Sequence, residues 1–346
     1  SVSKPFRHRK RALVSVSDKT GLEIFAKGLV ALGYDIISTG GTFKALEDCG
    51  IAAIPAEKIT QFPECFGGRV KTMHPLIMGG ILYKRDDEKQ KEEAGVLGIE
   101  PVDVVVVNLY PFAKTIRDLR RQKEDIGISP EAIEQIDIGG PALLRSAAKN
   151  HAHVTAVTDP ADYGRVLEAL TSGDIAALNR ELAAKVFLHT AAYDALIAEY
   201  LSGGVHNGIL LTAGKELRYG ENPHQWGKFY EVMSHESSVM SESVSQNSPL
   251  KTHNSRKWRQ LQGKDLSYLN ILDSDAAWRM ACEFTRPAAV LVKHANPSGI
   301  AEADDIASAF QAAYDSDRLS AFGVIIALNR TCTAGVVQKI LDQKIF

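Results

Sequence analysis

The sequence has no long apolar run and no strong net charge. The apolar stretches at 104–107 and 324–328 have the length of buried strands, whereas a membrane-spanning helix needs about 20 apolar residues. The 40 Lys and Arg residues nearly balance the 42 Asp and Glu residues, which leaves a formal net charge of −2. The sequence therefore predicts no membrane helix, and it lacks the charge expected of a general nucleic-acid binder.

Cysteine is also scarce. The four cysteines, at positions 49, 65, 282 and 332, include no close pair. This spacing supports neither a disulfide framework nor a zinc ribbon. We therefore expect reduced thiols, no metal site and a cytoplasmic location.

The rest of the composition is typical of a folded protein, with 45% hydrophobic and 24% charged residues. A chain of 346 residues is long enough for two domains, each with its own core. Residues 1–10 differ, because they carry four cationic side chains and no acidic one. We expect a solvated basic arm there, and the alternative is a fragment of an organelle-targeting peptide.

Residues 11–205 alternate between β-rich runs and runs with helical period, which predicts a first domain. Strands are predicted at 12–17, 34–38, 102–108 and 154–157, and helices at 20–32, 42–49, 130–135, 141–149 and 175–200. Such alternation favours a parallel sheet with helices on both faces.

Residues 206–346 predict a second, smaller α/β unit. The segment at 234–255 is rich in serine and has little apolar pattern, so we interpret it as a loop or disordered insertion. Beyond it, order resumes at 264–272. Helices are then predicted at 276–284 and 306–314, and strands at 288–292 and 323–328.

Three predicted strand-to-helix junctions of the first domain have the composition of anion sites. They are the segments 15–21, 38–42 and 137–141. The first two combine hydroxyl groups with glycine at a predicted helix start, and the third supplies a glycine pair there. Glycine lets the backbone approach a phosphate closely, and a helix N-terminus points N–H donors at it. Ligands of open α/β sheets bind at the carboxyl ends of the strands. Tight turns also need glycine, so each junction taken alone is weak evidence.

Four further polar residues of this domain could act on a bound ligand. Lys71 lies in a short loop with Arg69 and Thr72, which is either a solvated basic loop or a grip for phosphate. Tyr110 follows the apolar strand and is either a phenol at the rim of the core or a catalytic donor. Asp137 and Lys149 are twelve residues apart and form either an ordinary ion pair or a pair that acts on one substrate.

Two segments of the second unit are dense in recognition groups. Residues 217–225 hold Arg, Tyr, Glu, Asn and His, and Lys293 and His294 directly follow a predicted buried strand, just before a turn-forming segment at 296–299. Adjacent Lys and His suit paired roles, one stabilising negative charge and one moving a proton. His151 and His153 open a predicted strand on one face, but without a nearby carboxylate or cysteine they are a weak metal candidate.

Eight strings together resemble one family, the bifunctional purine-biosynthesis enzymes with IMP cyclohydrolase and AICAR (phosphoribosylaminoimidazolecarboxamide) formyltransferase activities. The strings are VSVSDKTG, STGGT, GRVKTMHP, VVVNLYPF, IDIGGPALLRSAAKNH, RYGENPHQ, DAAW and KHANPSG, and they follow the family's order over residues 11–330. The resemblance implies a methylglyoxal-synthase-like parallel-sheet domain followed by a cytidine-deaminase-like α/β transformylase domain without zinc.

For the first domain the resemblance implies closure of formyl-AICAR to IMP with loss of water and no cofactor. Lys71 and Tyr110 would polarise the formyl oxygen, and Asp137 and Lys149 would handle the amide proton or orient the carboxamide. The residues implied in nucleotide binding are Ser15, Ser17, Lys19, Ser38, Gly40, Gly41, Thr42, Arg69, Thr72, Gly139 and Gly140.

For the second domain it implies transfer of a formyl group from 10-formyltetrahydrofolate to the 5-amino group of AICAR. His294 would be the base on that amine, and Lys293 would stabilise the formyl oxygen. The residues implied in seating AICAR are Arg218, Tyr219, Asn222, His224 and Gly323. The family also implies a homodimer that binds nucleotides. The net charge and the short apolar runs predict no nucleic-acid or membrane partner.

The sequence departs from the family at a few points. Family members are longer, so we expect the chain to end within the transformylase half and formyl transfer to be weak. Ser298 stands where the family has a Cys, Met78 replaces a frequent His, and residues 316–324 read SDRLSAFGV. The rival hypotheses are a non-catalytic nucleotide-phosphate-sensing module and an RNA-binding protein. The joint presence of Lys71, Tyr110, Asp137 and Lys149 opposes the first, and the near-zero net charge opposes the second.

Overall fold

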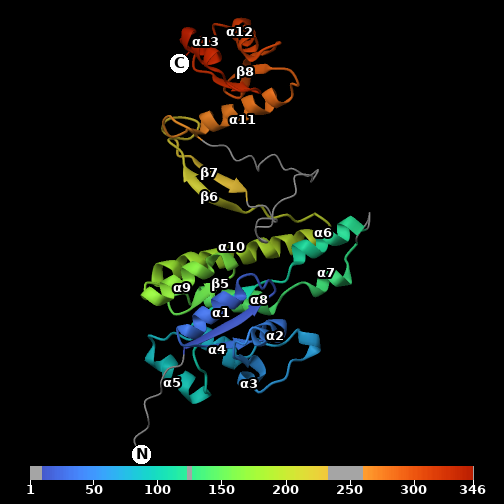
Figure 1. Ribbon diagram of the computed structural model, residues 1–346, viewed down its shortest axis with the longest axis vertical. Helices are drawn as coiled ribbons and strands as arrows, with labels where there is room; N and C mark the ends of the chain where they lie inside the picture. The colour runs from blue at the N-terminus through green and yellow to red at the C-terminus, as the bar shows by residue number, and fades with distance from the viewer. Residues whose placement is uncertain (1–9, 123–126, 233–259, 346) are drawn as a thin grey trace, which may run out of the picture. The chain divides into compact units, whose positions relative to one another are not determined.

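Short runs of Val, Ile and Ala build a parallel sheet in the first half of the chain. The computed structural model describes residues 10–122, 127–232 and 260–345 and is shown in Figure 1. The strands are β1 (Lys10–Val16), β2 (Tyr34–Ser38), β3 (Ala53–Pro55), β4 (Val104–Asn108) and β5 (Thr155–Val157). They lie in the order β3-β2-β1-β4-β5, with parallel neighbours throughout. This is the parallel sheet that the alternating pattern predicts.

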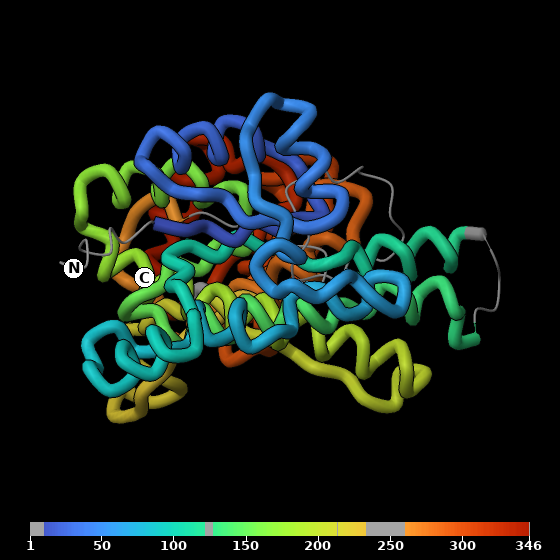
Figure 2. Tube along the Cα trace, turned by 90° about the horizontal axis from the view of Figure 1, so that it is seen from below, coloured from blue at the N-terminus to red at the C-terminus, as the bar shows by residue number. Residues whose placement is uncertain are grey.

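Helices cover both faces of this sheet, because successive strand residues point to opposite sides. On one face, Val14 and Val106 belong to a core cluster with the helices α1 (Leu22–Ala31), α2 (Gly40–Asp48) and α9 (Tyr163–Ser172). On the other face, Leu13 and Val105 belong to a core cluster with α4 (Pro75–Leu82), α6 (Phe112–Gln122), α7 (Pro130–Glu134), α8 (Gly139–Lys149) and α10 (Ala176–Leu201). In both views α6 and α7 lie side by side (Figures 1 and 2).

The predicted strands and helices of residues 11–200 are all present, with ends within two residues of the expected ones. The pattern missed α4, α6 and α9. The interior of α4 holds Gly79 and Gly80. A Cβ atom on Gly80 would lie 2.4 Å from the carbonyl oxygen of Glu100, so close packing requires glycine inside this helix. Further helical segments are α3 (Ala56–Thr60), η1 (Phe66–Gly68), α5 (Glu88–Leu97) and η2 (Pro160–Asp162).

The predicted strand start at His151 and His153 is wrong. Both residues lie in a turn after α8, and β5 begins only at Thr155. The turn forms because the N–H groups of His153 and Val154 donate to the carbonyl oxygen of Asn150. The two rings therefore do not share one face of a strand.

The described residues of the second half form two antiparallel sheets. The first is a hairpin of β6 (Leu211–Glu216) and β7 (Lys228–Val232). The second has the order β10-β8-β9, from β8 (Ala288–Lys293), β9 (Asn296–Glu302) and β10 (Ile325–Leu328). On one face Val290 and Val292 pack with α11 (Tyr268–Cys282); on the other, Ala289 and Leu291 belong to a core cluster with α12 (Ile306–Ser316) and α13 (Ala334–Asp342).

Two predictions in this half need correction. The segment 296–299 is not a turn but the start of β9, and the turn is formed by His294 and Ala295, both with positive φ. The helix predicted at 276–284 begins eight residues earlier, at Tyr268, because Ser267 and Asn270 form a capping box there.

The described residues divide into two compact units. Unit 1 contains 10–122 and 127–210, and unit 2 contains 211–232 and 260–345. Within these ranges every helix is too short or too polar to cross a membrane. Residues 1–9 of the predicted basic arm and the predicted serine-rich insertion at 234–255 lie outside the described residues.

Candidate active site

The carboxyl ends of β1 and β2 bring the first two glycine junctions into contact. Ser15 Oγ lies 3.5 Å from Thr39 Oγ1. Thr42 Oγ1 accepts a hydrogen bond from the Val16 N–H (3.0 Å) and donates one to the Val16 carbonyl (2.9 Å). The two junctions therefore form one continuous surface, as expected where neighbouring parallel strands end together.

Some predicted ligand residues have their side chains engaged inside the protein. Ser38 is fully buried and its hydroxyl donates to the Val14 carbonyl at 2.8 Å. With Thr42 also bonded to β1, the hydroxyls of both residues hold the junction together. The N–H groups of Gly40 and Gly41 open α2, where N–H groups have no partner within the helix, so they are the donors available to an anion.

Asn108 is a site residue that the sequence analysis missed. Its Oδ1 atom accepts hydrogen bonds from the Ser17 N–H (2.6 Å), the Ser17 hydroxyl (2.8 Å) and the Asp18 N–H (2.8 Å). Its Nδ2 donates to the Asp18 carbonyl at 3.2 Å. Asn108 thus fixes the loop after β1 from the end of β4, and the signal for it was the polar residue that ends the run VVVVN.

Lys19 folds back over the end of β1. Its ammonium donates to the carbonyl oxygens of Val16 and Ser17, the second at 3.3 Å. Partial burial lowers the pKa of Lys19, against the opposing effect of the Asp18 carboxylate. The charge of Lys19 therefore lies beside the junction, within the loop that Asn108 holds.

The basic loop reaches the same edge of the sheet. Lys71 Nζ lies 3.3 Å from Glu64 Oε1, and a Cβ atom placed on Gly40 would be 3.5 Å from that ammonium. Thr72 is buried, and a Cβ atom on Gly139 would be 3.6 Å from its hydroxyl oxygen. Lys71 and Thr72 thus connect the glycine junctions at α2 and α8.

Arg69 points elsewhere. Its guanidinium forms an ion pair with Glu134 of α7, and its side chain is 65% exposed. In this arrangement the two cations of the loop have separate acidic partners, and Lys71 is the one beside the glycine junction.

Asp137 lies before α8, close to Tyr110. Its Oδ1 accepts the Gly140 N–H at 2.7 Å, and the backbone of Tyr110 also hydrogen-bonds its carboxylate. Burial raises the pKa of Asp137, and these hydrogen bonds oppose the rise only in part. The Tyr193 hydroxyl accepts the Asp137 N–H at 2.8 Å. A Cβ atom on Gly140 would lie 2.4 Å from Asp137 Oδ2, so this contact requires glycine.

Tyr110 and Lys149 occupy different surroundings. Tyr110 is 44% exposed at the carboxyl edge of the sheet, where a phenol can reach a ligand. Lys149 is exposed at the last turn of α8. Because α8 has eleven residues, Asp137 and Lys149 are separated by about 16 Å of helix. The structure therefore brings Lys71, Tyr110 and Asp137 to one edge and leaves Lys149 at the other.

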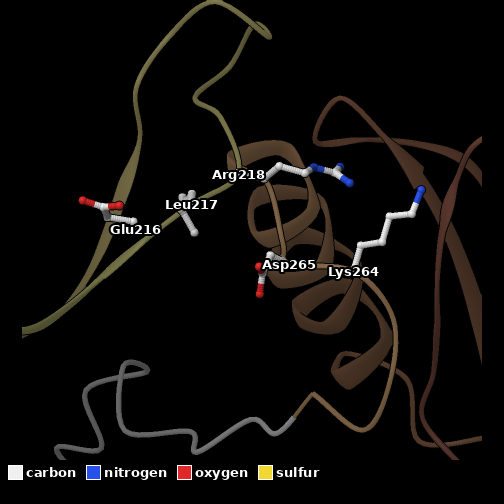
Figure 3. A pocket seen from close by; sticks show the side chains of 5 residues that line it. All are labelled: Glu216, Leu217, Arg218, Lys264 and Asp265. Carbon is white, nitrogen blue, oxygen red and sulfur yellow. The ribbon is translucent and has the colours of Figure 1, made fainter.

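A second candidate site lies within unit 2. Glu216, Leu217, Arg218, Lys264 and Asp265 line an open cleft of about 530 Å³. In Figure 3 the side chains of Arg218 and Lys264 extend to the same side of this cleft. Two neighbouring cations on one side of a cleft suit an anionic ligand.

The other residues predicted to seat AICAR lie beside and beyond this cleft. Tyr219 stacks under the Arg218 guanidinium, and hydrogen bonds with Ser267 and Arg218 lower the pKa of its phenol. Asn222 and His224 are exposed in the loop between β6 and β7, where the Asn222 N–H donates to Gln225 Oε1 at 2.7 Å. Together they form a polar loop at one end of the hairpin.

The predicted pair Lys293 and His294 lies at the turn between β8 and β9. Lys293 Nζ donates to the Phe322 carbonyl at 2.9 Å, which places it beside Gly323. The buried Asp273 accepts the N–H groups of His294 (3.2 Å) and Ala295 (2.7 Å). Asp273 was not predicted, and it holds a turn whose two residues both have positive φ.

In the part of the chain that the structure describes, no cluster of three or more His, Cys, Asp or Glu side chains could hold a metal ion. His153 instead contacts Asp86, with 3.2 Å between Nε2 and Oδ1.

Family models and known proteins match nearly the whole chain. Residues 21–142 match the model of the MGS-like domain, and residues 147–346 match the model of the AICARFT/IMPCHase bienzyme. The chain is similar to the bifunctional purine biosynthesis protein PurH of Anoxybacillus flavithermus (48% identity, 96% of this chain, 63% of the relative). It is also similar to the proteins of that name from Lactiplantibacillus plantarum (50% identity, 95% and 61%) and Bacillus subtilis (49% identity, 93% and 60%).

The chain thus spans about three fifths of the length of these relatives. A solved structure described as "Crystal structure of ForH" is 35% identical, with a TM-score of 0.49, and the match covers 57% of this chain and 100% of that one.

Proposed function

Because this chain belongs to the AICARFT/IMPCHase bienzyme family, we propose that its unit 1 closes formyl-AICAR to IMP with loss of water. The observation that carries the proposal is the gathering of Lys71, Tyr110 and Asp137 beside the glycine junctions at one edge of the sheet. A sensing module needs the junctions but not these three reactive groups.

Family membership also confirms the predicted fold class, with an MGS-like domain before the AICARFT domain. The cytidine-deaminase-like architecture of the second half, the domain boundary at 205 and 206, the homodimer and the cytoplasmic location stay predictions.

The proposed reaction joins two groups of one substrate. The carboxamide nitrogen attacks the formyl carbon, a carbon–nitrogen bond forms, and the formyl oxygen leaves as water with two protons. Lys71 and Tyr110 stabilise the negative charge that develops on the formyl oxygen. Asp137 accepts the amide proton, a task suited to a carboxylate whose burial raises its pKa.

The nucleotide is proposed to lie with its phosphate on the junctions. The N–H groups of Gly40, Gly41 and Gly139 supply donors at two helix starts. Gly140, whose N–H donates to Asp137 Oδ1, is proposed to shape the start of α8. Ser15, Ser17, Lys19, Ser38, Thr42, Arg69 and Thr72 complete the proposed seat, some of them by shaping the backbone rather than by direct contact. Lys149 is also proposed to act on the carboxamide, although it lies outside the cluster at this edge.

A second proposed activity is formyl transfer from 10-formyltetrahydrofolate to AICAR in unit 2. The cations that line the cleft there favour it, since AICAR carries a phosphate. Arg218, Tyr219, Asn222, His224 and Gly323 would seat AICAR, with His294 as base and Lys293 on the formyl oxygen.

The experiment is to follow IMP formation spectroscopically from two starting mixtures, formyl-AICAR alone and AICAR with 10-formyltetrahydrofolate. We expect ring closure without added metal and unchanged in chelator. Binding of IMP without any turnover of formyl-AICAR would instead support the sensing module.

A further inference from the structure

The ammonium of Lys71 is held by a carboxylate from its own loop. Glu64 Oε1 lies 3.3 Å from Lys71 Nζ, and the two side chains are only 37% and 24% exposed. A pair so shielded is screened by solvent less than a surface pair. The same ammonium lies beside Gly40 at the start of α2, so the pair is directed toward the proposed nucleotide seat.

Gly68 makes this pairing possible. A Cβ atom on Gly68 would lie 2.7 Å from Glu64 Oε1, 2.7 Å from Lys71 Cε and 2.9 Å from Lys71 Nζ. The two side chains therefore meet over the bare Cα of this glycine. Gly67 is the control position for Gly68. It also has a positive φ, but a Cβ atom added to it would have no contact within 4 Å.

The backbone of the loop brings positions 64 and 71 together. Cys65 and Val70 form an isolated antiparallel bridge, with the Cys65 N–H donating to the Val70 carbonyl at 3.3 Å. Glu64 and Lys71 flank this bridge on its two sides. The turn between them contains Phe66, Gly67 and Gly68, all with positive φ.

We propose that Glu64 is a positioning residue of the ring-closure site, whose carboxylate holds the Lys71 ammonium beside the β2–α2 junction across the space left by Gly68. The proposal rests on the proposed function of unit 1. A lysine side chain is long and flexible and carries a compact charge, so a fixed acceptor determines the position of its ammonium group. A fixed ammonium can stabilise a developing oxyanion without reorganising during the reaction.

The first test compares Glu64→Gln with Glu23→Gln, which removes the same charge from an exposed helical pair with Lys27. With ¹³Cε-labelled lysine and the Lys71 signal assigned through Lys71→Arg, NMR relaxation reports the mobility of Lys71. We expect Lys71 to become mobile in Glu64→Gln and to stay unchanged in Glu23→Gln.

Ring-closure kinetics give the second readout. A misplacement of about 1 Å costs about 10²-fold in rate, so we expect kcat of Glu64→Gln to fall about 10- to 100-fold while KM changes less than about 3-fold. Gly68→Ala should reproduce this loss, whereas Gly67→Ala should not, although both place alanine at a positive φ.

Two results would each overturn the proposal. One is an unchanged NMR relaxation of Lys71 in Glu64→Gln, and the other is a mobile Lys71 with an unaltered kcat. Equal losses in Gly68→Ala and Gly67→Ala would show that backbone strain is responsible and would also overturn it. If the unmodified chain forms no IMP, the proposed function fails, and the relaxation experiment alone decides whether Glu64 holds Lys71.

Discussion

At the scale of single residues, the proposed chemistry divides between a cation and a buried acid. Lys71 has one carboxylate partner and lies beside a helix start. Asp137 is bonded by N–H groups of Gly140 and Tyr110 and keeps a raised pKa because it is buried. One group is therefore suited to stabilise charge and the other to move a proton.

Replacing Lys71 tests the first of these roles. Lys71→Ala should reduce kcat by about 10²–10³-fold, the typical cost of losing one donor to a developing oxyanion, with little change in IMP affinity. Steady-state kinetics and IMP titration measure the two quantities. A loss of IMP affinity at unchanged kcat would make Lys71 a phosphate ligand instead.

The raised pKa of Asp137 predicts the pH dependence. If the ionised carboxylate accepts the proton, kcat/KM should fall as the pH drops through that raised pKa, so the acid limb should lie above the ordinary value of 3.8. Asp137→Asn should abolish this limb and most of the activity.

The same substitution should not destabilise the fold at pH 7. An acid whose pKa is raised in the folded state disfavours folding once it is ionised, and asparagine removes that cost. We expect the Tm of Asp137→Asn to equal or exceed that of the unmodified chain. A much lower Tm would mean that the loss of activity reports unfolding.

At the scale of elements, ion pairs tie α10 to the segment that precedes α9. Lys185 Nζ lies 2.6 Å from Asp159 Oδ2 and 2.7 Å from Asp162 Oδ2, and Asp162 is 5% exposed. Burial opposes the ionisation of Asp159, but hydrogen bonds from Lys185 and Ala161 outweigh it and lower its pKa. Both carboxylates thus share one ammonium, and Arg165 Nη1 also lies 3.5 Å from Asp162 Oδ1.

Lys185→Met should destabilise unit 1 by about 1–2 kcal/mol, less than a fully buried pair because Lys185 and Asp159 are each 38% exposed. The effect should be complete at pH 7 and shrink as the pH falls below the ordinary aspartate value of 3.8, since the lowered pKa of Asp159 stabilises the fold only while the carboxylate is ionised. Urea unfolding at several pH values measures it. Lys27→Met, in an exposed pair with Glu23, is the control and should change stability little.

At the scale of the whole molecule, each unit has core clusters of its own. The two clusters of the parallel sheet contain residues of unit 1, and the clusters around β8 contain residues of unit 2. A change at the turn between β8 and β9 therefore removes nothing from the core around the proposed ring-closure site.

The double variant Lys293→Ala, His294→Ala tests this independence. Ring closure from formyl-AICAR should keep its kcat and KM, and any IMP formed from AICAR with 10-formyltetrahydrofolate should disappear. The two assays already described measure both rates. A fall in ring closure would show that the units depend on each other more than their separate cores suggest.

The sequence by itself determined the family, through the eight strings that resemble it. It also determined the parallel sheet and its first two strand-to-helix junctions, because the spacing of apolar residues specifies a strand or helix within a few turns. The third predicted junction, at 137–141, follows the helix α7 and not a strand. The runs at 104–107 and 34–38 became buried strands, and the glycine pairs at 40–41 and 139–140 became helix starts.

Only the tertiary structure decided which side chains meet. Asn108 bonds Ser17 across 91 residues of chain. The polar end of the run VVVVN marks Asn108, but no local pattern identifies Ser17 as its partner. Glu64 and Lys71 come together because three residues of the turn between them have positive φ and because Cys65 and Val70 form a bridge. The sequence predicts that Lys149 acts together with Asp137, but the length of α8 separates the two residues. The contact of Asn108 with Ser17 arises from strand pairing over a long separation, and that of Glu64 with Lys71 arises from the backbone conformation of a turn. The spacing of apolar residues encodes neither.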